Sequence, residues 1–336
     1  MGRRERLAGE LTPAWKLALI VLPILAGLLS LSLGRFSVPL GDVLRALAGG
    51  DVDKQTKIVV LSIRLPRVLL ALLAGMGLST AGCAYQTLFA NPLATPDTLG
   101  VASGASFGAA LGLLLGLRML GVQLSALAFG FAAVALTGLS GKGSERGTGT
   151  VVLSGIMIGS LFSALVSLVK FVADPDSQLP AITYWLMGSL SGAGYDSLLL
   201  GAPPIVLGTA VLLALRWKLN LLPLPEDEAR ASGVNLPLLR GVTVLCATLM
   251  TASCVSMCGQ VGWVGLLVPH ICRMRFGNNH LSTLPASASL GAVFVVLVDT
   301  LARSATASEI PLSVLTAIAG APFFIYLLRR KGGWRL

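Results

Sequence analysis

Few side chains in this sequence have the type and spacing that acid–base, nucleophilic or metal chemistry requires. The two histidines, His270 and His280, are ten residues apart and have no triad-like or metal-like set around them. Of the five cysteines, Cys254 and Cys258 could share a helix face, but no histidine or carboxylate is close to them in the sequence. We therefore expect packed cysteines, no metal site and no catalytic centre, so the chain is not predicted to be an enzyme.

Charged groups that could move ions or bind a nucleotide are also scarce. The apolar stretches contain Lys170, Asp299 and Arg303, each near an end, whereas a proton- or sodium-coupled transporter usually carries buried acids or histidines along its path. The glycine-rich stretch 141–147 lacks the residue order of a phosphate-binding loop. These residues favour a transporter powered by other chains over a stand-alone secondary transporter or channel.

The composition indicates that membrane-spanning helices position these residues. Hydrophobic residues make up 54% of the 336 residues and charged residues 12%, whereas a soluble domain needs about 25% charged residues. The net charge of +10 is spread between the apolar runs, unlike the basic face of a nucleic-acid binder. We predict an all-α integral membrane protein with a single domain, residues 1–336, that contacts lipid and no nucleic acid.

Ten apolar runs are candidate spans. The first, Leu17–Leu33, follows Arg3, Arg4 and Arg6 as in a signal peptide, but it is long and no small-residue cleavage pattern follows, so we expect a retained span. An even number of spans places both termini on one side. The predicted spans are residues 15–34, 67–90, 97–117, 121–140, 150–172, 196–216, 237–257, 260–276, 284–302 and 312–329.

The lysine and arginine residues predict the orientation. With the N-terminus inside, 16 of the 25 basic residues fall on the inner side and 9 on the outer side, as the positive-inside rule expects. Six of those nine lie between Arg35 and Arg67, so the first external loop, residues 35–66, is unusually basic. Either an acidic partner docks there, or the loop is a solvated connection whose position the neighbouring spans impose.

Small residues recur every four positions in two of the predicted spans. Such a stripe lets helix backbones approach closely in lipid, where little hydrophobic driving force exists between helices. Helix packing is the expected role, and lining a path would be an additional one. The stripes are Gly100, Gly104, Gly108, Gly112 and Gly116 in one span and Gly155, Gly159, Ser163 and Ser167 in another.

The most informative polar segment is the inner loop of residues 223–236. Pro225 followed by three acids is typical of a helix start, because proline suits the first turn and acids complement the helix dipole. Gly233 suits the C-terminal end of the same short helix. Two alternatives stay open at this point, a helix that inserts into a partner protein and a plain connector.

Short motifs follow one another in a fixed order from about residue 38 onward. They are Arg64-Leu65-Pro66-Arg67, Asn91-Pro92-Leu93-Ala94, Leu99-Gly100-Val101, Glu228-Ala229-Arg230, Gly262-Trp263-Val264-Gly265, Asp299-Thr300, Glu309-Ile310-Pro311 and Gly320-Ala321-Pro322-Phe323-Phe324. In this order the chain resembles the FecCD-type permeases, which serve binding-protein-dependent ABC importers for iron–siderophore, heme and cobalamin.

The resemblance implies a type II ABC importer permease fold with about ten transmembrane helices. It also implies a second permease subunit, identical or different, two cytoplasmic ATPase subunits that use ATP and Mg²⁺, and a substrate-binding protein outside. No cofactor is expected in this chain. The protein would carry an iron chelate, siderophore or heme ahead of cobalamin, across the plasma membrane of a bacterium, with both termini in the cytoplasm.

The resemblance also assigns roles to individual residues. The short helix in residues 223–236 would couple to the ATPases, three arginines would dock the binding protein, and the span with the second small-residue stripe would line the path with the short helix after it, about residues 180–189. The coupling residues are Glu226, Asp227, Glu228, Ala229, Arg230 and Gly233; the docking residues are Arg64, Arg67 and Arg303; the path residues are Gly155, Gly159, Ser163 and Ser167.

Overall fold

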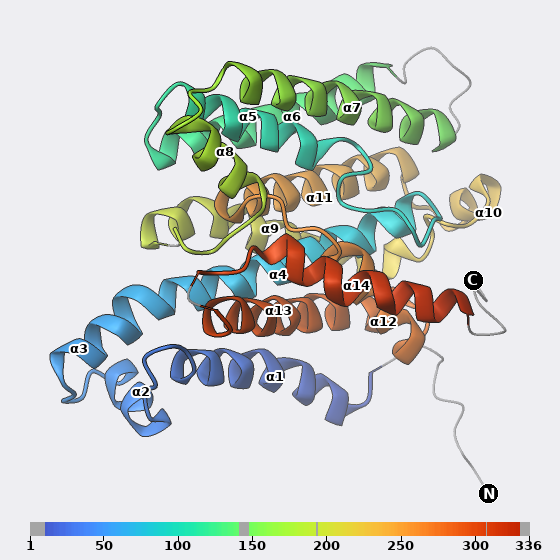
Figure 1. Cartoon of the computed structure of the whole chain (residues 1–336). Helices are drawn as coiled ribbons and strands as arrows, with labels where there is room; N and C mark the ends of the chain where they lie inside the picture. The colour runs from blue at the N-terminus through green and yellow to red at the C-terminus, as the bar shows by residue number, and fades with distance from the viewer. Residues whose placement is uncertain (1–10, 141–147, 193, 307, 330–336) are drawn as a thin grey trace, which may run out of the picture.

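The computed structural model describes residues 11–140, 148–192, 194–306 and 308–329, and within these ranges every regular element is a helix. The long helices lie side by side along one common direction (Figure 1). Seven are long and apolar enough to cross a membrane: α1 (Pro13–Ser32), the continuous helix Lys54–Leu88, α6 (Met119–Ser140), α7 (Thr148–Val172), α9 (Tyr195–Leu219), α11 (Leu236–Cys258) and α13 (His280–Ser304). The shorter helices α5 (Val101–Leu114), α12 (Val264–Phe276) and α14 (Leu312–Arg329) occupy the other three predicted positions.

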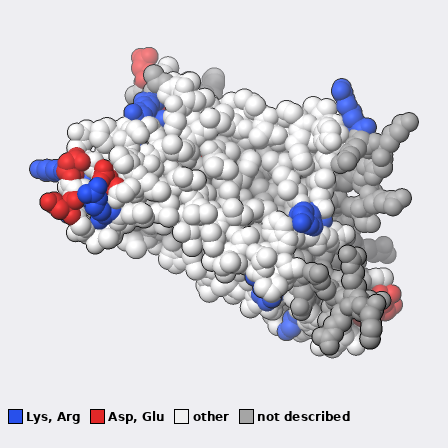
Figure 2. Space-filling view, turned by 90° about the horizontal axis from the view of Figure 1, so that it is seen from below, with Lys and Arg blue, Asp and Glu red and all other residues white. Residues whose placement is uncertain are grey.

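The molecule has two polar ends with an apolar band between them. We call the end that carries α2 (Leu40–Leu47), α3 (Lys54–Lys57) and α8 (Gln178–Leu186) the outer end. The inner end carries α10 (Glu226–Ala231), the start of α1 and the end of α14 (Figure 1). On the face in Figure 2 the charged side chains gather toward the two ends and leave a broad uncharged region between them, as a bilayer-spanning protein requires.

The second span begins earlier than the predicted residue 67. Helix α4 (Leu65–Leu88) continues back through η1 (Ile58–Arg64), a π-helical stretch, to α3. Pro66 cannot donate a backbone hydrogen bond, and the N–H of Leu65 reaches back five residues to the carbonyl of Val60. The hydroxyl of Tyr195 donates to the carbonyl of Leu61 at 2.6 Å, so the wider turn is held by a side chain from α9. Together with α2 (Leu40–Leu47), this early start makes most of the predicted external loop, residues 35–66, helical.

The centre of the bundle is formed by α4, α11 and α13, which are more buried than the other spans. Close backbone contact between α4 and α13 depends on Gly75 and Gly291. A Cβ at Gly75 would lie 2.1 Å from the carbonyl oxygen of Gly291, which no side chain can accommodate. Further along α4, a Cβ at Gly82 would lie 1.9 Å from the carbonyl oxygen of Gly265 in α12. Small residues thus set the spacing of the core helices.

The expected close approach along the small-residue stripe of α5 is confirmed. A Cβ at Gly104 would lie 2.5 Å from the carbonyl oxygen of Phe129 in α6, and one at Gly108 would lie 2.3 Å from that of Ser125. The two helices pack backbone to backbone at these two glycines, whereas Gly100 and Gly116 lie outside α5, with Gly100 near Gly159 of α7 and open space at Gly116. The side-chain hydroxyl of Ser125 also donates to the carbonyl of Gly108 at 2.7 Å.

Helix α12 is shorter than the predicted span of residues 260–276. Its helical part begins at Val264, after the non-helical segment 259–263. Non-helical backbone is tolerated at membrane depth only where protein or water covers it, and most of this segment is buried or half-buried. Trp263, which has a positive φ of 68°, packs on Gly320 of α14, where a Cβ would lie 2.4 Å from the indole.

Candidate functional site

The three arginines predicted to dock a partner lie at the outer end and are buried. Only 5% of Arg64, 8% of Arg67 and 8% of Arg303 is exposed. A buried guanidinium needs hydrogen-bond acceptors for its five N–H groups. Each of the three is held by acceptors within this chain, which gives them a structural role at the outer ends of α1, α4 and α13.

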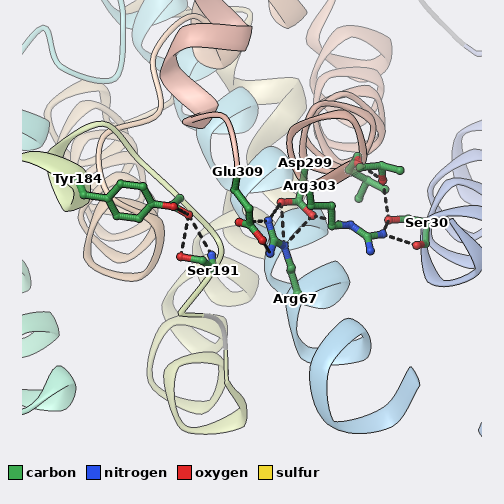
Figure 3. Close-up of polar contacts among 10 residues, drawn as sticks. Ser30, Arg67, Tyr184, Ser191, Asp299, Arg303 and Glu309 are labelled. Atoms are coloured by element: carbon green, nitrogen blue, oxygen red, sulfur yellow. Dashed lines mark hydrogen bonds and ion pairs between the residues drawn. The ribbon is translucent and has the colours of Figure 1, made fainter. Parts of the chain in front are cut away.

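Arg67, in the first turn of α4, is bound by two carboxylates (Figure 3). Its Nε and Nη2 donate to Asp299 of α13, with the shortest distance 2.8 Å from Nη2 to Oδ1. Its Nη1 and Nη2 donate to the two carboxylate oxygens of Glu309 at 2.8 and 2.9 Å. Both pairings are bidentate, the strongest geometry for an arginine. Three of the short motifs, those that contain Arg67, Asp299 and Glu309, therefore meet at one guanidinium.

Arg303 and Arg64 fasten α1 to this cluster. Arg303 donates to the backbone carbonyl and, at 2.9 Å, to the hydroxyl of Ser30, and its Nε lies 3.6 Å from Asp299. Arg64 donates to the carbonyls of Leu31 at 2.7 Å and Ser32 at 3.2 Å, at the end of α1, and to that of Phe36 beyond it. Gly34 leaves room for both: a Cβ there would lie 2.6 Å from Nη2 of Arg64 and 3.1 Å from Nη1 of Arg303.

The remaining basic residues of the segment 35–66 are on the surface. They are Arg35, Arg45, Lys54 and Lys57, all exposed. Arg35 donates to the carbonyl of Thr306 at 2.6 Å, next to the segment that carries Glu309. The structure thus divides the basic outer end into a buried set that joins helices and an exposed set that faces solvent.

Glu309 lies in the loop between α13 and α14, surrounded by positive charge. Its hydrogen bonds from Arg67 hold the pKa of the Glu309 carboxyl below its ordinary value, against the opposing effect of partial burial, and the charges of Arg67, Arg35 and Arg303 lower it further. The carboxylate is therefore ionised at neutral pH. Its 27% side-chain exposure contrasts with 1% for Asp299.

The predicted short helix of residues 223–236 is present at the inner end. It is α10, preceded by Pro225, and Gly233 after it has a left-handed φ of 73°. The three acids of its first turn are exposed, whereas Ala229 is buried. The side chain of Arg230 lies outside the described part of the structure. The helix therefore presents acidic side chains away from the bundle, with the small residue toward it.

A neutral polar network at the inner end joins the end of α9 to the start of α13 and to α4. Asn220, just after α9 and before α10, donates to Asn279 at 3.1 Å and accepts from the backbone N–H of His280 at 2.9 Å. The imidazole of His280 is hydrogen-bonded to the hydroxyl of Thr87 in α4 and donates to the carbonyl of Asn278 at 3.1 Å. Sequence reasoning missed this network, although an asparagine directly before a span is a recognisable helix cap.

The four predicted path residues of α7 divide into two pairs. Gly155 packs against the loop before α5, where a Cβ would lie 2.0 Å from the carbonyl oxygen of Thr98, and a Cβ on the half-buried Gly159 would be 3.8 Å from Gly100. Ser163 and Ser167 are exposed. The glycines thus pack within this chain, whereas the serines lie on a face that the chain does not cover.

Several other predicted positions can be placed. The five cysteines are free and buried, as the expected packing role requires. Among the described residues no group of three His, Cys, Asp or Glu side chains is arranged to hold a metal ion. The glycine-rich stretch 141–147 and the arginines at positions 3, 4 and 6 lie outside the described residues.

Comparison with known proteins agrees with this arrangement. The model of the FecCD transport family matches residues 21–330. The molybdate import system permease protein MolB of Haemophilus influenzae is 40% identical over 94% of this chain and 96% of that protein. A probable iron chelatin transport system permease protein of Helicobacter pylori is 36% identical over 94% and 96%. A solved inward-facing structure of a metal-chelate type ABC transporter superposes with a TM-score of 0.86, at 38% identity, over 94% of this chain and 99% of that chain. This chain therefore belongs to the FecCD transport family of ABC importer permeases.

Proposed function

We propose that this chain is the permease through which an iron chelate, a siderophore complex or heme ahead of cobalamin, crosses the plasma membrane of a bacterium into the cytoplasm. The observation that carries the proposal is the placement of an exposed acidic helix at one end of the bundle and of the basic segment 35–66 at the other. An importer permease needs these two contact surfaces, one for its ATPase and one for its binding protein. The inner end, and with it both termini, is then cytoplasmic.

The assembly follows from the surfaces that this chain leaves uncovered. Helix α7 exposes large apolar side chains, among them Met157, Leu168 and Phe171, which suits contact with lipid and with a second permease subunit, identical or different. Helix α10 and the rest of residues 223–236 seat in one of two ATPase subunits, which hydrolyse ATP with Mg²⁺. A rigid-body change of the two permeases then opens the path to one side at a time.

Docking of a substrate-binding protein is assigned to the outer end. Arg64, Arg67 and Arg303 are buried there, so they shape the docking surface and fix its helices. The exposed basic residues around them attract an acidic partner and affect its association rate more than its affinity. A basic external segment, residues 35–66, in a protein that follows the positive-inside rule elsewhere supports this assignment.

An iron chelate is favoured as cargo by the path-facing residues and by two comparisons. Ser163 and Ser167 offer hydroxyls and no charge on the uncovered face of α7, which suits a large chelate that slides past many weak contacts. The iron chelatin permease and the metal-chelate transporter structure point the same way. The 40% identity to a molybdate permease makes molybdate the second candidate.

The test is uptake into proteoliposomes that contain the complete transporter with ATP inside and its substrate-binding protein outside. We expect ATP-dependent accumulation of an iron-55 siderophore complex or of heme. Accumulation of labelled molybdate alone would replace the cargo and leave the importer function intact. Accumulation driven by a proton or sodium gradient without the ATPases would overturn the importer function in favour of a secondary transporter.

A charge-reversal variant tests the coupling helix within the same experiment. Changing Glu226, Asp227 and Glu228 to lysine should abolish ATP-driven uptake while the binding protein still docks. The matched control changes Asp174 and Asp176, two exposed acids at the outer end, to lysine. This control should retain ATP-driven uptake, because neither residue lies near the ATPase contact. Normal uptake by the α10 variant would contradict the assignment of α10 to the ATPase contact.

A further inference from the structure

Arg67 is held by two carboxylates that differ in origin and exposure. Asp299 belongs to α13, and its side chain is 1% exposed, whereas Glu309 belongs to the connecting segment 305–311 and its side chain is 27% exposed. Asp299 takes the Nε and Nη2 edge of the guanidinium, and Glu309 takes the Nη1 and Nη2 edge (Figure 3). The Glu309 contact is therefore the one that a molecule approaching from outside can reach.

Arg67 differs in this respect from the other two buried arginines. Arg64 donates to backbone carbonyls, and Arg303 donates to Ser30 and pairs with the buried Asp299. Neither has an exposed carboxylate as its partner among the described residues. A carboxylate from a partner can replace the side chain of Glu309 and keep Arg67 paired. The backbone carbonyls that hold Arg64 and Arg303 cannot be replaced in this way, because they would move only with the chain that carries them.

The segment that carries Glu309 is also bonded to the neighbouring elements. The N–H of Ile310 donates to the carbonyl of Ala302 at 3.2 Å, and that of Leu312, at the start of α14, donates to Gly188 at 2.9 Å. The hydroxyl of Ser313 donates to the carbonyl of Met187 at 2.6 Å. The start of α14 and the segment after α8 are thus linked to each other, and Glu309 ties both to the α4–α13 pair.

We propose that Glu309 occupies the position on Arg67 that a carboxylate of the docking protein takes, so that docking displaces Glu309 and releases residues 308–311 from α4 and α13. The proposal rests on the proposed docking of a binding protein at the outer end. It names the chemistry of the contact: an aspartate or glutamate side chain that binds the Nη1 and Nη2 edge of Arg67. Two carboxylates cannot share that bidentate edge.

The charges around the site favour exchange over simple loss of Glu309. Without its carboxylate, the guanidinium of Arg67 would be balanced by Asp299 alone, with Arg303 and Arg35 close by. The excess positive charge attracts an acidic side chain to the same place. In the free protein Glu309 satisfies Arg67, and in the docked complex the partner's acid does, so the arginine is paired in both states.

The first test compares the affinity of the binding protein for the complete transporter in lipid nanodiscs. Glu309→Gln removes the internal competitor and should tighten binding about threefold to tenfold, because an ion pair of this exposure contributes on the order of 1 kcal/mol. The matched control is Asp51→Asn, which removes one exposed acid from the same end and should change the affinity less than about twofold. Equal affinities of the two variants, or weaker binding by Glu309→Gln, would overturn the proposal.

The second test needs no substitution. Hydrogen–deuterium exchange is measured on the wild-type transporter with and without the binding protein, at residues 308–313. Docking should speed exchange at Ile310 and Leu312, whose N–H groups are hydrogen-bonded in the free protein, and unchanged or slower exchange would overturn the proposal. If the wild-type transporter does not bind the protein at all, the docking function itself fails, an outcome distinct from normal docking without displacement.

Discussion

The two ends of the α4–α13 pair are fastened by different chemistry. At the outer end, Arg67 of α4 meets Asp299 of α13 in a buried ion pair, with Glu309 added from the loop. At the inner end, Thr87 of α4 meets His280 of α13 in a hydrogen bond that involves no carboxylate. The difference teaches that the outer end depends on charge balance, which a charged partner can disturb, whereas the inner end depends on shape and hydrogen bonding.

The largest expected effect comes from breaking the outer contact. Arg67→Met would leave two carboxylates facing each other, one of them buried, so the free energy of unfolding should fall by about 3–5 kcal/mol. Thermal unfolding in detergent can be followed with a maleimide dye, because all five cysteines are buried in the native state. The control is Arg45→Met, whose exposed pair with Asp42 contributes no more than about 1 kcal/mol. Equal unfolding temperatures for the two variants would show that the ion pairs of Arg67 do not stabilise the outer contact.

A smaller effect is expected at the inner contact. His280→Ala removes the hydrogen bond between α4 and α13, but the hydroxyl of Thr87 still donates to the carbonyl of Cys83, so the cost should be about 1 kcal/mol. In a double-mutant cycle with Thr87→Val, the coupling energy should be on the order of 1 kcal/mol, because either change alone already removes the bond between the two side chains. Strictly additive effects in the same dye assay would mean that the two residues do not hold the helices together.

The smallest effect concerns pH and separates the two ends directly. Because the pKa of Glu309 is lowered in the folded protein, its contribution to stability is complete above its ordinary value of 4.5 and is lost as the pH falls through the lower, folded value. As the pH falls from 6 to about 3, the unfolding temperature of wild type should therefore fall more than that of Glu309→Gln, with the difference appearing below pH 4.5. Parallel pH profiles would indicate that Glu309 is not ionised or not paired in solution.

The sequence alone predicted the parts of this structure that depend on local pattern. The apolar runs located ten helices, of which seven are long and apolar enough to cross a membrane, and Pro225, the acids after it and Gly233 predicted α10 within a residue or two. These features are encoded by residues close together in the chain. The π-helical start of the second span was missed, because the hydroxyl that supports it comes from Tyr195, far along the sequence.

The sequence could not predict which arginines are exposed. Arg45 and Arg67 look alike as isolated basic residues in an external segment, yet one forms a surface pair and the other lies in a buried cluster. The environment of Arg67 is set by Asp299 and Glu309, more than 200 residues away, whereas Arg45 pairs with Asp42, three residues away. Asp299 and Arg303 lie four residues apart and pair in α13, but their spacing gives no indication that Arg67 joins them. The docking roles of Arg64, Arg67 and Arg303 stay a prediction.

The contact between Gly75 and Gly291 has a consequence for motion. Each backbone fills the space where the other residue would carry a side chain, with a hypothetical Cβ only 2.1 and 2.4 Å from the opposite carbonyl oxygen. Sliding one helix past the other would push a carbonyl oxygen into a Cα, so the register of the pair is fixed. If docking displaces the outer ends of α4 and α13, the two helices must then move as one unit. The displacement reaches their inner ends as a tilt or rotation of the pair, and the helices do not slide along each other.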